Sequence, residues 1–176
     1  IGFGGIAKKV LAMAQGFGMQ VKVWTRSPEK HLDHYSAELF TDMETLLQTS
    51  DFISLHLPLN ENTHGILGYD EIHNIKVGAT LINTARGGLV DEPTLISALQ
   101  GGHLRGAGLD VFAEEPLADG HPLLSLDNVI LSPHVAYNTP DAVKAIFEIT
   151  VRNICGYWIL SETSVFGSKN LNSADR

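Results

Sequence analysis

Short strand-like runs alternate with helix-period apolar segments along most of the chain. The runs are rich in Val, Ile and Leu, and they cover residues 20–24, 52–57, 79–84, 106–110 and 129–131. Strands separated by helices pair in parallel, because each crossover helix returns the chain to the same end of the sheet. The crossover helices then cover both faces. The sequence therefore predicts an α/β fold built on a doubly wound parallel sheet.

The helices between these runs have recognisable ends. Asp42, Asp91 and Thr139 precede helical segments and can cap them by accepting from free backbone N–H groups. The first helix follows Gly4, and its apolar face is predicted to consist of Ile6, Val10, Ala14 and Phe17. Residues 161–176 are polar and rich in Ser and Asn, so we expect a loose tail there.

Composition argues against several classes of function. The chain has 176 residues, 44% of them apolar, which is enough for one domain with a buried core. Twenty acidic residues against twelve Lys and Arg give a formal charge of −8, whereas nucleic acids and anionic membranes need a basic face. A single cysteine, Cys155, leaves no disulfide framework and fits a reducing cytoplasm. Apolar runs stay far below the roughly 20 residues that span a bilayer.

A glycine pattern opens the chain. Gly2, Gly4 and Ala7 fit the pattern G-x-G-x-x-G/A, in which the small residues allow a tight turn, backbone approach to a pyrophosphate, and packing of helix on strand. The helix N-terminus adds free N–H groups and a partial positive charge. A plain glycine-rich turn fits the same residues. The position at the head of an amphipathic helix that a strand follows favours dinucleotide binding.

We therefore expect residues 1–160 to form a dinucleotide-binding domain. Ile1 is not a methionine, and the glycine pattern begins at the second residue. Only Ile1 then remains of the strand that precedes the glycines in such domains, so the first strand is expected to be truncated.

Three longer motifs are more specific. They are L-I-N-T-A-R-G-G-L-V-D-E at residues 81–92, G-A-G-L-D-V-F-A-E-E-P at 106–116 and L-S-P-H-V-A at 131–136. In this order and spacing they closely resemble the nucleotide-binding domain of the D-isomer-specific 2-hydroxyacid dehydrogenases, from Ile1 to about Trp158. The resemblance implies a Rossmann-type domain and hydride transfer between a nicotinamide cofactor, NAD or NADP, and a small D-2-hydroxy acid or 2-oxo acid. It also implies that the substrate domain, mostly encoded upstream in the family, is absent from this chain, which alone is not expected to turn over.

The resemblance assigns catalytic roles to Arg86, Glu115 and His134. Arg86 follows a predicted strand, and its planar fork suits the carboxylate and carbonyl oxygens of a 2-oxo acid; a surface ion pair is the alternative. His134 is expected to move the proton, and Glu115 to orient the imidazole and favour its charged form. Isolated histidines more often have structural roles, and we interpret the other seven in that way. Glu114 is expected to be solvated.

The resemblance also implies a set of cofactor contacts. The backbone and side chains expected there belong to Gly2, Gly4, Gly5, Ile6, Leu57, Pro58, Thr84, Ala85, Arg86, Asp110, His134 and Ala136. Asp110 is expected to bond the nicotinamide carboxamide, although an aspartate that ends a strand can instead cap the next turn. Leu57 and Pro58 border the adenine or ribose, or simply pack in the core. Gly5 stands where relatives carry a polar residue beside the pyrophosphate.

Residues 25–27 favour NADP over NAD. The acidic residue that binds the adenosine ribose should follow the glycines by about 20 residues. Thr25, Arg26 and Ser27 occupy this position, and none of them is acidic. The missing carboxylate removes the repulsion of a 2′-phosphate, and Arg26 and Ser27 could bind it. Arg26 pointing into solvent is the alternative.

Other functions fit less well. A formate dehydrogenase would pair its histidine with Gln rather than Glu115. A dinucleotide-sensing corepressor of this family keeps Arg86, Glu115 and His134, so these residues leave that alternative open. The histidines show no zinc-type spacing, so we expect no metal. A homodimer is expected from the resemblance, with residues 89–104 and 116–126 at the interface, where the apolar residues 122–124 hint at a buried contact.

Overall fold

The computed structural model describes the backbone of residues 1–165 and the side chains of residues 1–156, residue 37 excepted. This part of the chain contains two compact units, Ile1–Val135 and a second that begins at Ala136. The first unit contains the sheet, the helices α1 to α4 and four short 3₁₀ turns at Pro28–His31, Ala37–Leu39, Gly87–Leu89 and Pro122–Ser125. The second contains one long helix, α5.

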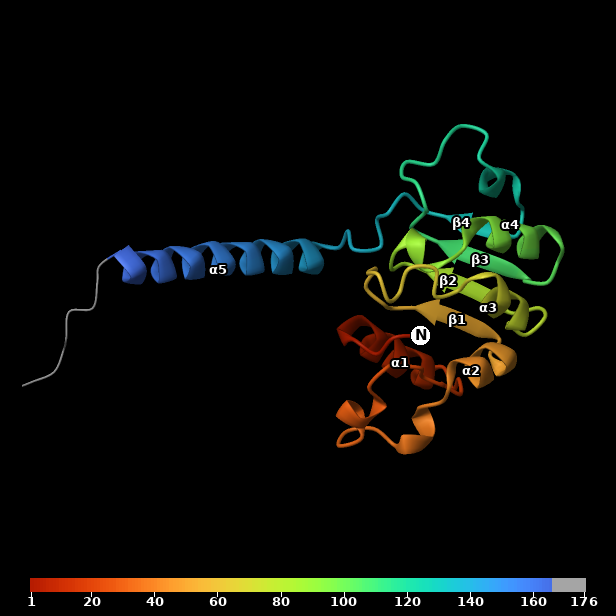
Figure 1. Cartoon of the computed structure of the whole chain (residues 1–176), viewed down its shortest axis with the longest axis horizontal. Coiled ribbons are helices and arrows are strands. Elements are labelled where there is room, and N and C mark those ends of the chain that lie inside the picture. Colours follow the sequence, from red (N-terminus) through yellow and green to blue (C-terminus); the bar gives the residue numbers. More distant parts are fainter. Residues whose placement is uncertain (166–176) are drawn as a thin grey trace, which may run out of the picture. The chain divides into compact units, whose positions relative to one another are not determined.

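Four strands form a parallel sheet. They are β1 (Phe52–Leu55), β2 (Thr80–Asn83), β3 (Gly106–Leu109) and β4 (Val129–Leu131), in the spatial order β1-β2-β3-β4 (Figure 1). The predicted parallel sheet is confirmed, and the first three strands are one or two residues shorter than expected.

The N-terminal backbone continues this pairing beyond β1. The amino group of Ile1 donates to the carbonyl of Ser54, and the N–H of His56 donates to the carbonyl of Ile1. On the other side, Gly2 donates to the carbonyl of Trp24. The chain therefore runs outward from residues 1–2 and then returns to β1 on their opposite side. This reversal of strand order is where nucleotides bind in doubly wound sheets.

The predicted strand at residues 20–24 is reduced to one parallel bridge between Val23 and Phe40. Its neighbours explain the difference, because residues 1–2 provide little backbone for pairing on one side. The extended segment was therefore predicted at the correct position, but the prediction of a regular strand was wrong.

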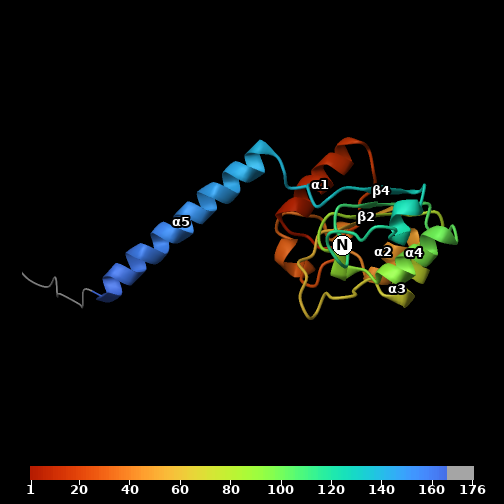
Figure 2. The ribbon, with the colours of Figure 1, turned by 90° about the horizontal axis from the view of Figure 1, so that it is seen from above.

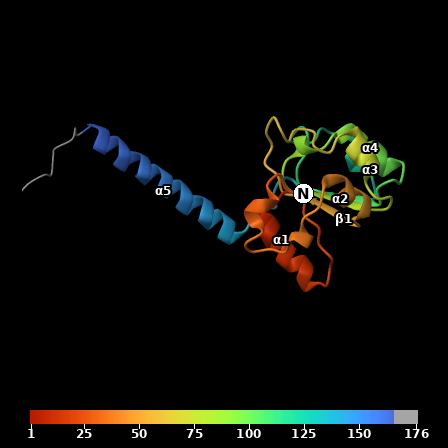
Figure 3. The same ribbon diagram turned by 60° about the horizontal axis from the view of Figure 1, so that its bottom comes forward.

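Helices α2 (Met43–Thr49), α3 (Tyr69–Asn74) and α4 (Glu92–Gln100) lie on one face of the sheet, and α1 (Gly5–Gly16) lies on the opposite side (Figures 2 and 3). Strands β1, β2 and β3 bury residues in the main core, among them Ile53, Leu55, Leu81 and Leu109. Two predicted caps are confirmed: Asp42 accepts from Thr45 N at 2.7 Å, and Asp91 from Thr94 N at 3.1 Å. Each cap contributes about 1 kcal/mol.

The predicted apolar face of α1 is wrong. Ala7 and Leu11 are its buried residues, and they pack with Phe3 and Val23 in a second small cluster. Ile6 is 71% exposed, and Phe17, which follows the last helical residue, is 85% exposed. The contacts with Phe3 and Val23, rather than the size of the apolar side chains, determine which face turns inward.

Helix α5 spans Pro140–Val165, and Thr139 Oγ1 accepts from Ala142 N at 3.2 Å, as the predicted cap requires. The helix continues five residues into the expected tail, and residues 166–176 lie outside the described residues. Within residues 1–165, none of the helices has the length and apolar character needed to cross a membrane.

Candidate active site

The sheet register brings four connections to one edge. The last residues of the strands are paired in a single row, Leu55 with Asn83, Asn83 with Leu109, and Leu109 with Leu131. The segments that follow therefore leave the carboxyl edge of the sheet side by side, where ligands bind in such folds. The predicted site residues of the first unit beyond residue 55 come from these four segments: Leu57, Pro58, Thr84, Ala85, Arg86, Asp110, Glu115 and His134. Ala136, also predicted for the site, begins the second unit.

The glycine turn lies against the segment that follows β1. Gly2 has φ +91°, and a Cβ atom there would lie 2.7 Å from the carbonyl oxygen of His56, so only glycine fits. Gly4 caps α1, and a Cβ on Gly4 or Gly5 would meet nothing within 4 Å. The start of α1 is thus open to a ligand, and its N–H groups suit an anion. The side chain of Ile6 is exposed, so the predicted contact of Ile6 with the cofactor is assigned to its backbone.

The segment of Leu57 and Pro58 adjoins the same turn. A Cβ on Gly2 would lie 3.1 Å from a methyl group of Leu57, and Leu57 also packs against the main core. Pro58 is exposed, and its carbonyl accepts from Thr63 Oγ1 at 2.6 Å. Leu57 is therefore a packing residue that also borders the glycine turn, and its contact with an adenine or ribose stays a prediction.

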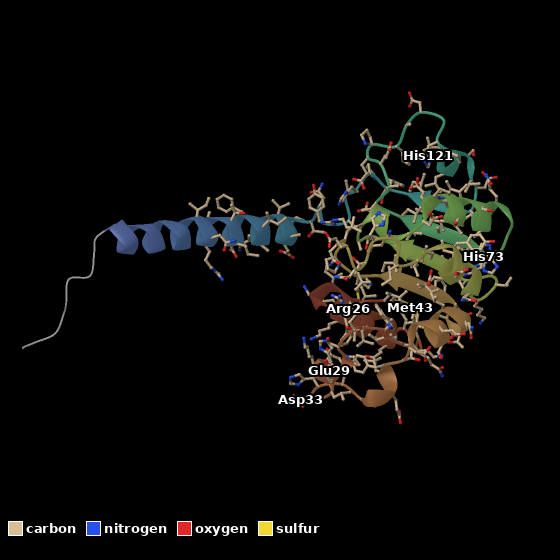
Figure 4. All side chains as sticks on the ribbon, viewed as in Figure 1. Arg26, Glu29, Asp33, Met43, His73 and His121 are labelled. Atoms are coloured by element: carbon tan, nitrogen blue, oxygen red, sulfur yellow. The ribbon has the colours of Figure 1, made fainter. Side chains whose placement is uncertain are left out.

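Residues 25–27 begin next to the glycine turn, because Trp24 accepts from Gly2 N. Thr25 and Ser27 are half-buried, and Arg26 is exposed (Figure 4). Residues 25–27, from which NADP selectivity was predicted, therefore follow directly on a residue that is hydrogen-bonded to the glycine turn.

A buried asparagine shapes the segment that carries Arg86. Asn83 ends β2 and is 2% exposed. Its Oδ1 accepts from Ala85 N at 3.0 Å, and its Nδ2 donates to the carbonyl of Arg86 at 2.9 Å. The exposed side chain of Arg86 donates to the carbonyl of Ala85 at 2.6 Å, and Thr84 is also exposed. Sequence reasoning missed Asn83, although a polar residue inside a buried strand was the available signal.

The segment that carries Arg86 packs closely at Gly87 against the segment that follows β3. A Cβ on Gly87 would lie 1.9 Å from the carbonyl oxygen of Phe112, a separation that no real atom pair allows. The absence of a side chain at Gly87 thus permits the backbones of the two segments to touch.

Glu115 and His134 form a hydrogen-bonded pair. Oε2 of Glu115 lies 2.7 Å from Nδ1 of His134, and its Oε1 accepts from Phe112 N at 3.0 Å. The hydrogen bond with His134, then that from Phe112, and then the charges of His134 and Arg86 hold the pKa of Glu115 below its ordinary value. Glu115 and His134 are thus brought together by a hydrogen bond, and a shared site with Arg86 stays a prediction.

Asp110 secures the turn that carries His134. This aspartate is 3% exposed, and its Oδ1 accepts from Ser132 Oγ at 2.6 Å and from Val135 N at 2.9 Å. These partners flank His134, whose φ of 55° lies in the left-handed region. The predicted contact of Asp110 with a nicotinamide carboxamide stays a prediction. Ser132 was not predicted as a site residue.

A cavity of about 490 Å³ adjoins the Glu115–His134 pair. Apart from these two and Ser132, its lining is apolar and comes from Phe112, Pro116, Leu117, Leu124, Leu131 and Pro133. The pair therefore lies at the border of an apolar hollow, on the carboxyl side of β3 and β4.

Comparison with known proteins agrees with this arrangement. The family model of the D-isomer specific 2-hydroxyacid dehydrogenase NAD-binding domain matches residues 1–136. A glyoxylate reductase of Thermococcus litoralis is 40% identical over 157 residues, which are 89% of this chain and 47% of that protein.

Two solved structures are similar as well. The NADPH-dependent glyoxylate/hydroxypyruvate reductase of Sinorhizobium meliloti, in complex with citrate, has a TM-score of 0.79 and 30% identity, covering 89% of this chain and 48% of that one. An acyclic imino acid reductase in complex with NADPH and D-Arg has a TM-score of 0.81 and 33% identity, covering 90% and 50%.

The chain thus spans about half the length of the relatives to which it is similar. The family model, however, covers most of the present sequence, including the glycine turn and the segments that carry Arg86, Glu115 and His134. The chain belongs to the D-isomer-specific 2-hydroxyacid dehydrogenases, and residues 1–136 are NAD-binding domain.

Proposed function

We propose that the protein containing this chain is an oxidoreductase that interconverts a small D-2-hydroxy acid and the corresponding 2-oxo acid. The observation that carries the proposal is the Glu115–His134 hydrogen bond, with the charge of Arg86 acting on the same carboxylate. An acid–base histidine beside a guanidinium is what the reduction of a 2-oxo acid requires.

The three residues have separate tasks. Arg86 binds the carboxylate of the substrate through its fork and so orients the neighbouring carbonyl group. His134 donates a proton to the carbonyl oxygen during reduction, and accepts it from the hydroxyl group during oxidation. Because Nδ1 faces Glu115, Nε2 is the nitrogen that serves the substrate. Glu115 orients the imidazole and stabilises its charged form.

The glycine turn and the start of α1 fit a dinucleotide. Only glycine fits at residue 2, the start of α1 is unobstructed at Gly4 and Gly5, and the turn lies where the strand order reverses. A bound nicotinamide cofactor supplies the hydride at C2 of the substrate. We assign its pyrophosphate to residues 2–6, and its nicotinamide side to Thr84, Ala85, Asp110 and His134.

NADPH is the cofactor that we propose. Thr25 brings no negative charge to the ribose position, and Arg26 and Ser27 follow it with a guanidinium and a hydroxyl group. The two similar structures described above are, respectively, a reductase called NADPH-dependent and a complex with NADPH. The proposal rests on the missing carboxylate, because Arg26 is exposed.

The corepressor alternative is not favoured. The similar proteins are called reductases and dehydrogenases. We place the enzyme in the cytoplasm, where Cys155, which is exposed, would stay reduced.

We also propose that the protein is a homodimer, with residues 89–104 and 116–126 at the interface. Of the apolar residues 122–124, Leu123 is 1% exposed in its own unit and Leu124 is 56% exposed, so Leu124 is the one that offers apolar surface. Light scattering of the full-length protein at micromolar concentration should give twice the monomer mass. A monomer alone would contradict the proposal.

One experiment tests the proposed activity. Glyoxylate, hydroxypyruvate, pyruvate and phosphohydroxypyruvate are offered to the full-length protein with NADPH and with NADH. We expect turnover of at least one of these acids, with the higher kcat/KM for NADPH. Absence of turnover for all of them with both cofactors would contradict the proposed reaction.

A further inference from the structure

The carboxylate of Glu92 contacts two points of the segment between β3 and the turn at Pro122–Ser125. Glu92, the first residue of α4, accepts through Oε2 from Ala113 N at 3.1 Å. Its Oε1 lies 3.2 Å from Nε2 of His121, which is labelled in Figure 4. The side chains of Glu92 and His121 are only 16% and 20% exposed. Glu92 therefore bridges residues 113 and 121 from a neighbouring element.

The hydrogen bonds of His121 fix which nitrogen carries the proton. Leu123 N donates to Nδ1 of His121 at 3.3 Å, so Nδ1 is an acceptor there. Nε2 then carries the hydrogen and donates it to Glu92. Both oxygens of Glu92 thus act as acceptors, and the N-terminus of α4 favours the negative charge there.

Ala113, which Glu92 holds, belongs to the turn that determines where the side chain of Glu115 lies. Ala113 lies between Phe112 and Glu115, and Phe112 N donates to Oε1 of Glu115. The carbonyl of Phe112 touches Gly87 on the other side. The turn of residues 112–115 is therefore fixed by the Gly87 backbone contact and by the carboxylate of Glu92.

We propose that Glu92, supported by His121, is a positioning residue that holds the turn of residues 112–115 and thereby directs Glu115 toward His134. The inference rests on the proposed function for its catalytic consequence. Glu92 is the last residue of the motif at residues 81–92 but was not among the predicted site residues, and it acts through Glu115 rather than on the substrate.

The first test replaces Glu92 by glutamine in the full-length protein. The Gln side chain offers one acceptor and one donor, so one of the two bonds becomes a contact between two donors. A small displacement of a catalytic group costs up to about 100-fold in rate. We expect kcat to fall about 10-fold or more and the Kd of NADPH to stay within about 2-fold. Glu114→Gln, the same change at an exposed neighbour, should change neither.

A double-mutant comparison separates positioning from general support of the fold. If Glu92 acts through Glu115, Glu92→Gln should lower kcat in the wild-type background and change it less than about 2-fold in a Glu115→Gln background. Equal losses in the two backgrounds would overturn the proposal, because Glu92 would then act independently of Glu115.

A measurement without turnover distinguishes this inference from the proposed function. The pKa of the Glu115 carboxyl group is followed by ¹³C NMR, and it should rise in Glu92→Gln as its hydrogen bonds loosen, but not in Glu114→Gln. An unchanged pKa overturns the positioning role even if the enzyme is active. A raised pKa supports it even if no 2-oxo acid is reduced.

A second variant covers the case in which Glu92→Gln does not fold. His121→Asn can keep an acceptor for Leu123 N, but it is too short to donate to Glu92. It should lower kcat by less than Glu92→Gln and raise the same carboxyl pKa. If neither quantity changes in His121→Asn, the supporting role of His121 is wrong.

Discussion

Nδ1 of His134 lies 2.7 Å from Oε2 of Glu115, across a sequence separation of 19 residues. Each partner is secured separately: Glu115 by the N–H of Phe112, and the His134 turn by Asp110. The segments that follow β3 and β4 therefore each hold one partner, and the distance between the two side chains depends on both segments.

Replacing His134 by alanine removes the proposed proton donor. In the full-length enzyme kcat should fall by at least ~100-fold, the usual scale of general acid–base catalysis, with little change in NADPH affinity. Steady-state kinetics and a binding titration measure both. His73→Ala, at an exposed histidine on α3, is the control and should keep full activity. Unchanged turnover in His134→Ala would refute the assignment.

Replacing Arg86 by lysine keeps the charge and loses the fork. We expect KM for the oxo acid to rise about 10-fold or more, and kcat to fall, because a single ammonium group cannot hold the carboxylate in the same orientation. The Kd of the dinucleotide should not change. Arg105→Lys provides a control at a different arginine. If dinucleotide binding alone weakens, Arg86 is a cofactor ligand instead.

Replacing Thr25 by aspartate should shift cofactor selectivity toward NADH. The added carboxylate repels a 2′-phosphate, an effect typically worth about 1–3 kcal/mol. The ratio of kcat/KM for NADPH to that for NADH measures the shift. Thr25→Ala removes the hydroxyl group without adding charge, so its ratio should stay close to that of the wild type. A wild-type preference for NADH would contradict the proposed cofactor.

Replacing Gly87 by alanine should destabilise the domain. The new methyl group would overlap the Phe112 carbonyl, and forcing backbones apart costs about 1–3 kcal/mol or more. A lower Tm and a lower kcat should appear together, since the displaced segment carries Glu115. Gly108→Ala is the control, because a Cβ there would meet nothing within 4 Å. A Tm equal to that of the control would show that the contact relaxes freely.

The lowered pKa of Glu115 predicts a pH-dependent stability. Because this pKa is lower in the folded state than the ordinary value of 4.5, the carboxylate adds stability above the latter, and the gain is lost as the pH falls through the folded-state pKa. Glu115→Gln should therefore be less stable than the wild type near pH 7, with the difference shrinking as the pH falls below the ordinary value of 4.5. Denaturant unfolding at several pH values measures it.

The fold was largely predictable because its signals are local. Strand-like runs, caps at Asp42 and Asp91, and glycine stops each depend on a few adjacent residues. The face of α1 was not predictable from periodicity, because two apolar stripes compete on that helix. The stripe with Ala7 and Leu11 turns inward through contacts with Phe3 and with the distant Val23.

The site was predictable where a motif marks it, and not where distant segments meet. Arg86, Glu115 and His134 followed from the motifs. The tasks of Ser132 and Glu92 depend on partners 22 and 21 residues away, at Asp110 and Ala113, and no local pattern carries such contacts. The contact of Gly87 with Phe112 likewise appears only in the folded chain.

The left-handed backbone of His134 has a cost in stability that the imidazole itself offsets. A non-glycine residue with φ 55° costs about 1–2 kcal/mol, a penalty that glycine does not carry. Glycine at residue 134 would remove this penalty, but it would also remove the hydrogen bond to Glu115 and add the entropic cost of a flexible residue. The side chain on which the proposed chemistry depends is therefore also one that stabilises the turn that carries it.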